Sequence, residues 1–410
     1  MITRRSFVAA AVMAGIALPG MAHAVTEMSA TYKWPEIQGP GVDPKRTRFI
    51  SGRGIRTELK NSEMIRPDLR FDRSAEANPS MAFTHGVVLA RAASPDLPLV
   101  AMDAATGKLA WERDQTLKLL GVGGKTAFIV TAPVSDQILP ILKAIDVTGP
   151  TDIWAVGEGE ILGAVVIPEE SIVYLRQLED NMELVSRDIA SGKVLWTTDV
   201  NDALDSDAIL STDGQVVVGV NVTTNISRYM NAWDATTGEL LWSNEGPGYI
   251  SAPAFRNNEL LIATMEGINL IDPATGEILQ EIDLPANNGG LVQLIITEDA
   301  LVIVDSERFH SVDWASGKVN WSHAPEQAAS ATDVYACDGK IYRIEKSAES
   351  SGCETTLRGY SLKDGSLEVE YLPVNSERTQ LSATAFLIGA QHLFLGTEAG
   401  LGNWSPSEKA

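Results

Sequence analysis

The chain has 410 residues, of which 44% are hydrophobic and 21% charged, enough to form a large apolar core. Its 54 acidic residues outnumber 32 basic ones and give a formal charge of −22. Such an acidic surface repels phosphate backbones, which argues against a nucleic-acid-binding protein. After residue 24 no stretch has enough consecutive apolar residues to span a bilayer, so we expect no membrane span in the mature chain.

Residues 1–24 are predicted to be a twin-arginine signal peptide. Arg4 and Arg5 precede an apolar run from Ala9 to Leu18, which is too short to cross a bilayer comfortably. The run ends near Ala22-His23-Ala24, which has the small-x-small form of a signal-peptidase site. We therefore expect export by the twin-arginine route, cleavage before Val25 and a periplasmic location.

Residues 25–78 form a second segment with a different charge. From Asp43 to Arg73 it holds nine Lys/Arg against five acidic residues. Two interpretations are open. The segment is either a strap that lies across the acidic body of the same chain, or a docking arm for another protein. We also expect it to contribute a strand to the fold that follows.

Residues 79–410 repeat one sequence unit, and Ala232–Trp242, AWDATTGELLW, is its clearest copy. An Asp side chain caps a tight turn, and Gly supplies the positive φ that the turn needs. Seven copies end at positions 111, 154, 196, 242, 280, 321 and 369, a period of 38 to 48 residues. Self-similarity of this length in an all-strand pattern indicates a propeller or an array.

Each unit contains a second hairpin signal, such as Asp213-Gly214, between runs rich in β-branched residues. Four strands per unit make one propeller blade, so we predict an all-β fold of four-stranded antiparallel sheets. A final hairpin at 383–397 lacks its own Asp-Gly turn, and eight blades are favoured over seven. A strand from the N-terminal segment, within Arg48–Leu59, is predicted to close the ring because a closed ring hides its free edges.

The pattern Ala-x-Asp-x-x-x-Gly-x-x-x-Trp resembles the tryptophan-docking repeat of the pyrroloquinoline-quinone-like β-propellers. In size and repeat spacing the chain is most similar to the BamB-type outer-membrane assembly propellers. The resemblance implies that each tryptophan packs between blades on the glycine peptide of an adjacent motif, and that Gln280 and Val369 weaken two junctions. The residues predicted to have this structural role are Asp103, Gly107, Trp111, Trp154, Asp188, Gly192, Trp196, Asp234, Gly238, Trp242, Asp272, Gly276, Asp313, Gly317 and Trp321.

The family includes quinoprotein dehydrogenases, which carry pyrroloquinoline quinone and calcium, and non-catalytic propellers, which bind proteins. The dehydrogenases place two adjacent cysteines against the quinone, whereas Cys337 and Cys353 are sixteen residues apart. We therefore expect no catalytic, cofactor-binding or metal-binding residues. The predicted function is a protein-binding scaffold for another periplasmic or envelope protein, in envelope or outer-membrane protein assembly. The alternative is a quinoprotein dehydrogenase or its accessory subunit.

Other chemistry-bearing residues have ordinary explanations. His310 and His323 flank one repeat and could meet at a rim, but strand or loop positions explain them equally. Asp202, Asp205 and Asp207 are spaced as in a calcium loop, although a solvated turn is the simpler interpretation.

Two further expectations concern surfaces and thiols. Loops that depart from the repeat are predicted to bind a partner, and they contain the apolar residues Ile138, Leu139 and Tyr249. The loops are 93–98, 131–140, 244–249 and 346–352.

The two cysteines are predicted to lie at opposite ends of a blade, too far apart to form a disulfide.

Overall fold

The computed structural model describes the residues that form the sheets and most of their turns. The described ranges are 49–50, 59–66, 80–92, 96–133, 139–179, 181–200, 203–204, 208–221, 229–283, 292–297, 300–305, 308–314, 316–324, 334–346, 355–371, 383–389, 392–397 and 400–406. The chain divides into two units, Met1–Lys33 and Trp34–Ala410, and all described residues belong to the second. The predicted signal peptide and Cys353 lie outside the described residues.

The first four sheets follow the repeat in strict chain order. Blade 1 contains β3 (Ser80–Thr84), β4 (Val87–Arg91), β5 (Leu99–Asp103) and β6 (Leu109–Arg113). Blade 2 contains β7 (Thr116–Gly123), β8 (Thr126–Thr131), β9 (Ile141–Asp146) and β10 (Asp152–Gly157). Blade 3 contains β11 (Glu160–Ile167), β12 (Ser171–Leu178), β13 (Asn181–Asp188) and β14 (Val194–Asp199). Blade 4 contains β15 (Ala208–Thr212), β16 (Val216–Asn221), β17 (Tyr229–Asp234) and β18 (Leu240–Glu245).

The remaining sheets continue the order, and the last two also take strands from the N-terminal segment. Blade 5 contains β19 (Ala254–Arg256), β20 (Glu259–Ala263), β21 (Gly267–Ile271) and β22 (Ile278–Asp283). Blade 6 contains β23 (Gln293–Ile296), β24 (Ala300–Val304), β25 (Phe309–Asp313) and β26 (Val319–His323). Blade 7 contains β27 (Val334–Cys337), β28 (Lys340–Lys346), β29 (Thr355–Ser361) and β30 (Leu367–Tyr371). Blade 8 contains β31 (Ala383–Gly389), β32 (His392–Thr397) and β33 (Gly400–Pro406).

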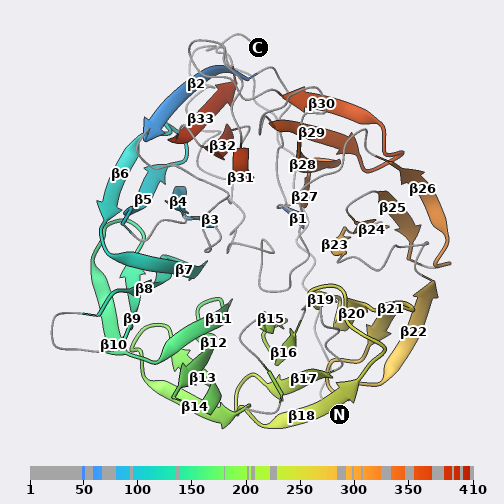
Figure 1. Cartoon of the computed structure of the whole chain (residues 1–410), viewed down its shortest axis with the longest axis horizontal. Helices are drawn as coiled ribbons and strands as arrows, with labels where there is room; N and C mark the ends of the chain where they lie inside the picture. The colour runs from blue at the N-terminus through green and yellow to red at the C-terminus, as the bar shows by residue number, and fades with distance from the viewer. Residues whose placement is uncertain are drawn as a thin grey trace, which may run out of the picture. The chain divides into compact units, whose positions relative to one another are not determined.

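Within this unit the eight sheets follow one another around a ring (Figure 1). The first strand of each blade lies inside and the fourth outside, and the innermost strands of successive blades, such as β11 and β15, touch. The predicted eight-bladed, all-β propeller is therefore confirmed.

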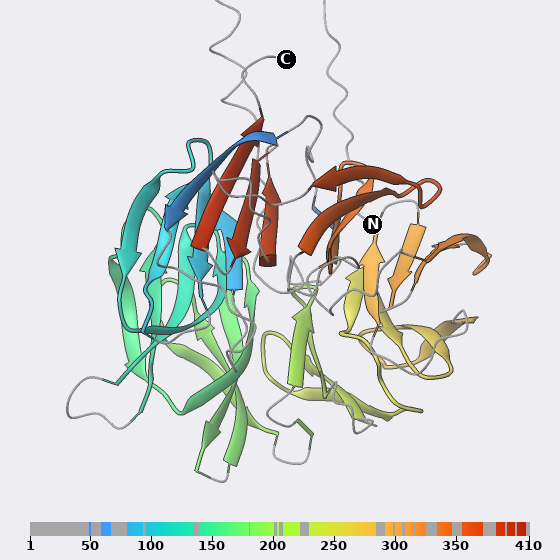
Figure 2. The ribbon, with the colours of Figure 1, turned by 45° about the horizontal axis from the view of Figure 1, so that its top comes forward.

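The N-terminal segment contributes to the ring at two places. β2 (Leu59–Arg66) pairs antiparallel with β33 and forms the outer strand of blade 8, beside the C-terminal strands (Figure 2). β1 (Phe49–Ile50) pairs parallel with β27 at the inner edge of blade 7. The segment thus supplies the closing strand, but the predicted position within Arg48–Leu59 was wrong because that strand begins at Leu59 and continues to Arg66.

The hydrophobic core is divided among the seams between neighbouring blades. One cluster joins blades 3 and 4 through residues such as Val173 and Trp233, and another joins blades 6 and 7 through residues such as Phe309 and Tyr360. The seam where the ring closes joins blades 7, 8 and 1 in a single cluster. Because side chains alternate between the two faces of a strand, each blade supplies apolar residues to both of its seams.

Candidate functional site: docked tryptophans, buried ion networks and an exposed outer row

Five motif tryptophans bind the following blade through the same hydrogen bond. Indole Nε1 of Trp196, in blade 3, donates to the carbonyl of Ala235 in blade 4 at 2.9 Å. The acceptor always follows the motif aspartate, or the serine that replaces it in blade 7. The other four bonds join Trp111 to Val147 (2.9 Å), Trp154 to Ile189 (2.7 Å), Trp242 to Pro273 (2.8 Å) and Trp321 to Leu362 (3.1 Å).

Four of these indole rings lie directly against the motif glycine of the next blade. A Cβ atom at Gly238 would be 2.5 Å from Cε3 of Trp196, closer than real Cβ contacts allow. The corresponding closest distances are 2.6 Å for Gly192 and Trp154, 2.7 Å for Gly276 and Trp242, and 2.8 Å for Gly365 and Trp321. Gly238 also has φ of +74°. Only glycine meets both requirements at no steric cost.

Other junctions depart from this arrangement, among them the one that follows blade 7, where Val369 occupies the tryptophan position. Trp111 meets the shortened turn of blade 2, where Gly149 has open space around the position of a Cβ atom. Blade 5 has exposed Gln280 at the tryptophan position, and Ile282 instead lies 3.5 Å from the Cβ position of Gly317.

The motif aspartates hold the turns. In blade 4 the carboxylate of Asp234 accepts hydrogen bonds from the amides of Thr236 and Thr237 at 2.9 and 2.8 Å, and the carbonyl of Asp234 accepts one from Gly238 at 2.8 Å. The bond from the Thr237 amide is the largest cause of a lowered pKa at Asp234. In four other blades the amide of the motif glycine donates to the carbonyl of the motif aspartate and closes the same turn. These bonds join Gly107 to Asp103, Gly192 to Asp188, Gly276 to Asp272 and Gly317 to Asp313.

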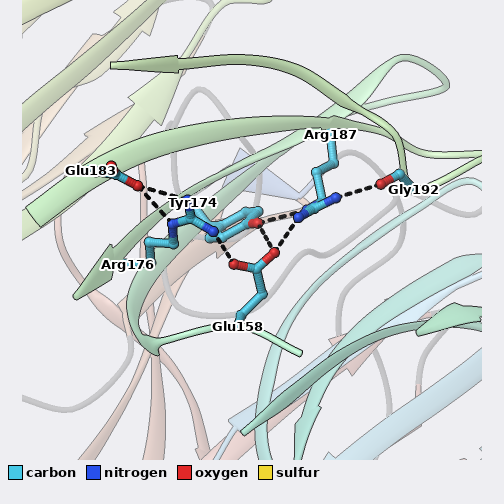
Figure 3. Close-up of polar contacts among 6 residues, drawn as sticks. All are labelled: Glu158, Tyr174, Arg176, Glu183, Arg187 and Gly192. Atoms are coloured by element: carbon cyan, nitrogen blue, oxygen red, sulfur yellow. Dashed lines mark hydrogen bonds and ion pairs between the residues drawn. The ribbon is translucent and has the colours of Figure 1, made fainter. Parts of the chain in front are cut away.

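A buried ion network lies in blade 3, where sequence reasoning singled out no charged site (Figure 3). The fully buried carboxylate of Glu158 accepts a hydrogen bond from the Tyr174 hydroxyl at 2.8 Å and pairs with both Arg176 and Arg187. Nε and Nη2 of Arg176 reach one oxygen of Glu183 at 2.9 and 2.7 Å. Burial, reinforced by Glu158, raises the pKa of Tyr174, so its hydroxyl stays protonated and keeps donating.

A second network of the same composition lies in blade 7. Glu345, also fully buried, accepts a hydrogen bond from the Tyr360 hydroxyl at 2.6 Å and pairs with Arg358 at 3.0 Å and Arg343 at 3.2 Å. Nε and Nη2 of Arg358 lie 3.1 and 2.9 Å from one oxygen of Glu370. The signal in the sequence was the spacing of Arg343 and Glu345, since charges two residues apart share one face of a strand.

The two histidines of blade 6 do not meet. His310 pairs with Ser322, and its neighbour Phe309 pairs with His323, which places the histidines on opposite faces of the sheet. His323 lies 5.0 Å from the ring of Tyr360, in the seam with blade 7. His310 is 4% exposed, and neither ring nitrogen has a hydrogen-bond partner among the described residues.

Several other expectations concern metals and loops. The described residues hold no group of three or more His, Cys, Asp or Glu side chains placed to bind a metal ion. Asp202, Asp205 and Asp207 lie outside the described residues, as do residues 93–95, 134–138 and 347–352 of the predicted binding loops. Tyr249 was wrongly assigned to an exposed loop surface, because it packs in the core between blades 4 and 5 with 3% exposure. Leu139 is exposed.

Among the described residues, the outer strands of blades 1 to 7 each leave a large aliphatic side chain exposed, and those of blades 3, 4 and 5 leave two. We call six of these side chains the outer aliphatic row: Val194, Leu195, Leu240, Leu241, Ile278 and Leu279, with exposed fractions between 39% and 55%. They occupy β14, β18 and β22, which succeed one another along the outer edge of the ring (Figure 1). Each of these strands ends its sheet.

These features define an eight-bladed β-propeller whose blades are joined by docked tryptophans. The family model described as outer membrane protein assembly factor BamB matches residues 140–367, more than half of the chain. The chain therefore belongs to the PQQ-like, BamB-type β-propeller family. Within the described residues, no helix has the length and hydrophobicity needed to cross a membrane.

Solved structures share the fold at low sequence identity. BamB from Moraxella catarrhalis is 16% identical with a TM-score of 0.53, covering 85% of this chain and 100% of its own. Sqt1 from Saccharomyces cerevisiae is 11% identical with a TM-score of 0.60, covering 86% and 100%. The quinohemoprotein alcohol dehydrogenase ADHIIG from Pseudomonas putida HK5 is 12% identical with a TM-score of 0.58, covering 88% and 76%. No curated protein matches the sequence.

Proposed function

We propose that this chain is an exported, non-catalytic propeller that holds another periplasmic or envelope protein during envelope or outer-membrane protein assembly. The family match over residues 140–367 carries the proposal. The twin-arginine pattern at Arg4 and Arg5 and the signal-peptidase site before Val25 support export to the periplasm.

The outer aliphatic row supports a protein partner and suggests where it binds. Soluble proteins protect the edges of their sheets with charges or proline, because an exposed apolar edge pairs readily with another chain. Leu195 and Leu241 are instead exposed on strands that end their sheets. A partner that covers these strands would remove the apolar surface from water and satisfy the free backbone groups.

The test is cross-linking in intact cells from a photoreactive residue in place of Leu240, which is exposed on the same strand as Leu241, followed by mass spectrometry. We expect one envelope protein to be captured, and the double substitution Leu195→Glu with Leu241→Glu to abolish its recovery. Leu367→Glu is the control, since Leu367 is exposed on the outer strand of blade 7, at the motif position that Leu240 occupies in blade 4. Equal recovery with and without the double substitution would refute this binding surface, and capture of no partner from the probe at position 240 would refute the scaffold function.

The competing function, a quinoprotein dehydrogenase or its accessory subunit, needs a separate test. Purified protein is incubated with pyrroloquinoline quinone and calcium, and dye reduction is measured over alcohols and sugars. We expect none, because Cys337 and Cys353 are not the adjacent pair that the dehydrogenases place against the quinone. Dye reduction that depends on substrate would overturn the non-catalytic function.

A further inference from the structure

The four arginines of the two buried networks differ in one respect. In arginine, Nε and Nη2 lie on the same edge of the guanidinium and present two parallel N–H groups, which we call the fork edge. Glu183 covers the fork edge of Arg176, and Glu370 covers that of Arg358. Arg187 donates from Nε to the Tyr174 hydroxyl at 2.8 Å and from Nη2 to Glu158.

The fork edge of Arg343 makes no hydrogen bond within the described residues. Nε lies 3.2 Å from Oε1 of Glu345, but neither Nε nor Nη2 makes a hydrogen bond to any part of the chain that the structure describes. The side chain is only 1% exposed, so water at the surface does not serve these N–H groups either. A buried charged donor without an acceptor costs more than an ordinary lost hydrogen bond.

The protonation behaviour of the four arginines agrees with this difference. Burial lowers the pKa of Arg343, and the nearby carboxylates of Glu345 and Asp305 do not compensate. For Arg176, Arg187 and Arg358 burial acts in the same direction, but their hydrogen-bonded partners outweigh it and raise the pKa. Of the four guanidinium groups, that of Arg343 is therefore the one whose neighbouring carboxylates do not offset the effect of burial on its pKa.

The surroundings of Arg343 set the size of a possible ligand. The guanidinium carbon lies 4.8 Å from the centre of the Phe309 ring, which belongs to blade 6, so the group sits in the seam between blades 6 and 7. Gln293 pairs with Val304, which pairs with Phe309, so these three residues lie in one row across the sheet of blade 6. The Oε1 atom of Gln293 is also buried and has no hydrogen-bond partner among the described residues. A ligand at this position would lie between packed side chains, so a small group would disturb the seam least.

We propose that the fork edge of Arg343 binds one small free carboxylate, of the size of acetate, enclosed between blades 6 and 7. A carboxylate matches the parallel N–H groups with two hydrogen bonds and supplies the missing negative charge. Because the carboxylate would bind the folded chain and not the unfolded one, its binding would stabilise the seam between these two blades. This site is independent of the outer aliphatic row and of the proposed scaffold function.

Thermal unfolding in sodium acetate and in sodium chloride of equal ionic strength, at neutral pH, tests the proposal. At acetate concentrations well above the dissociation constant, we expect acetate to raise Tm by about 2–5 °C over chloride. Arg343→Lys keeps the charge but loses the fork edge, and should lose this acetate-specific rise. Arg176→Lys is the matched control and should keep it, because Glu183 already covers that fork edge.

A measurement on the unmodified protein is needed if Arg343→Lys does not fold. Titration of ¹⁵N-labelled protein with acetate, observed in the arginine Nε–H region, should shift one slowly exchanging signal, and chloride should leave it unchanged. An acetate-specific rise in Tm that persists in Arg343→Lys, or no response of any Nε–H signal to acetate, would overturn the proposal.

Discussion

Adding one methyl group at Gly238 separates the two reasons why the docking motif needs glycine. In Gly238→Ala the new Cβ atom would lie 2.5 Å from Cε3 and 2.6 Å from Cδ2 of Trp196, and 2.9 Å from Oγ1 of Thr198. The backbone at this position has φ of +74°, which alanine adopts only with strain. The substitution therefore combines local strain with overpacking in the seam between blades 3 and 4.

The two contributions can be estimated separately. Left-handed backbone costs a residue with a Cβ atom about 1–2 kcal/mol. Overpacking of a well-packed core costs about 1–3 kcal/mol more. Gly317→Ala is the matched control, because φ is +66° and the nearest atom, Cγ2 of Ile282, is 3.5 Å away, an ordinary contact. We expect Gly238→Ala to lose about 2–5 kcal/mol of unfolding free energy and Gly317→Ala about 1–2 kcal/mol.

Urea unfolding followed by circular dichroism measures both losses, provided that the slopes of the transitions agree. Placing Gly238→Ala in a Trp196→Ala background removes the opposing ring and should reduce its cost to the backbone strain plus the contact with Oγ1 of Thr198. Equal losses for Gly238→Ala and Gly317→Ala would refute the steric argument, as would an undiminished cost of Gly238→Ala in that background.

Three further predictions address export, the buried networks and pH. Replacing Arg4 and Arg5 by Lys should retain the protein in the cytoplasm on cell fractionation, and normal periplasmic recovery would indicate another route. Glu158→Ala leaves two arginines without their shared buried carboxylate and should cost about 3–5 kcal/mol in urea unfolding; a loss under about 1 kcal/mol would contradict a structural role. Burial lowers the pKa of His310, so the unfolded chain binds more protons below pH 6.5. Stability should therefore fall as pH drops below about 6.5, by up to about 1.4 kcal/mol per unit, until the lowered pKa is passed. His310→Leu should remove this slope, and an unchanged slope would exclude His310 as its source.

The sequence by itself determined the repeating unit, the blade count and the tryptophan motif. These are local properties. Asp234 and Gly238 specify a turn through bonds within five residues, and continuous apolar runs such as that of β8 specify strands that are buried on both faces. Repetition of such a unit leaves ring closure as the way to bury the last seam, so the need for a strand from the N-terminal segment was also predictable.

Only the tertiary structure decided which segment closes the ring and which charges meet. Leu59–Arg66 is polar and carries no repeat signal, so its place beside β33 depends on pairing between chain ends far apart in sequence. Tyr249 occurs in a loop by sequence, yet a neighbouring blade covers it. Glu158, in the connection between β10 and β11, likewise meets Arg187 of β13 only in the folded chain. The strength of a buried ion pair depends on distance and burial, and a linear pattern encodes neither.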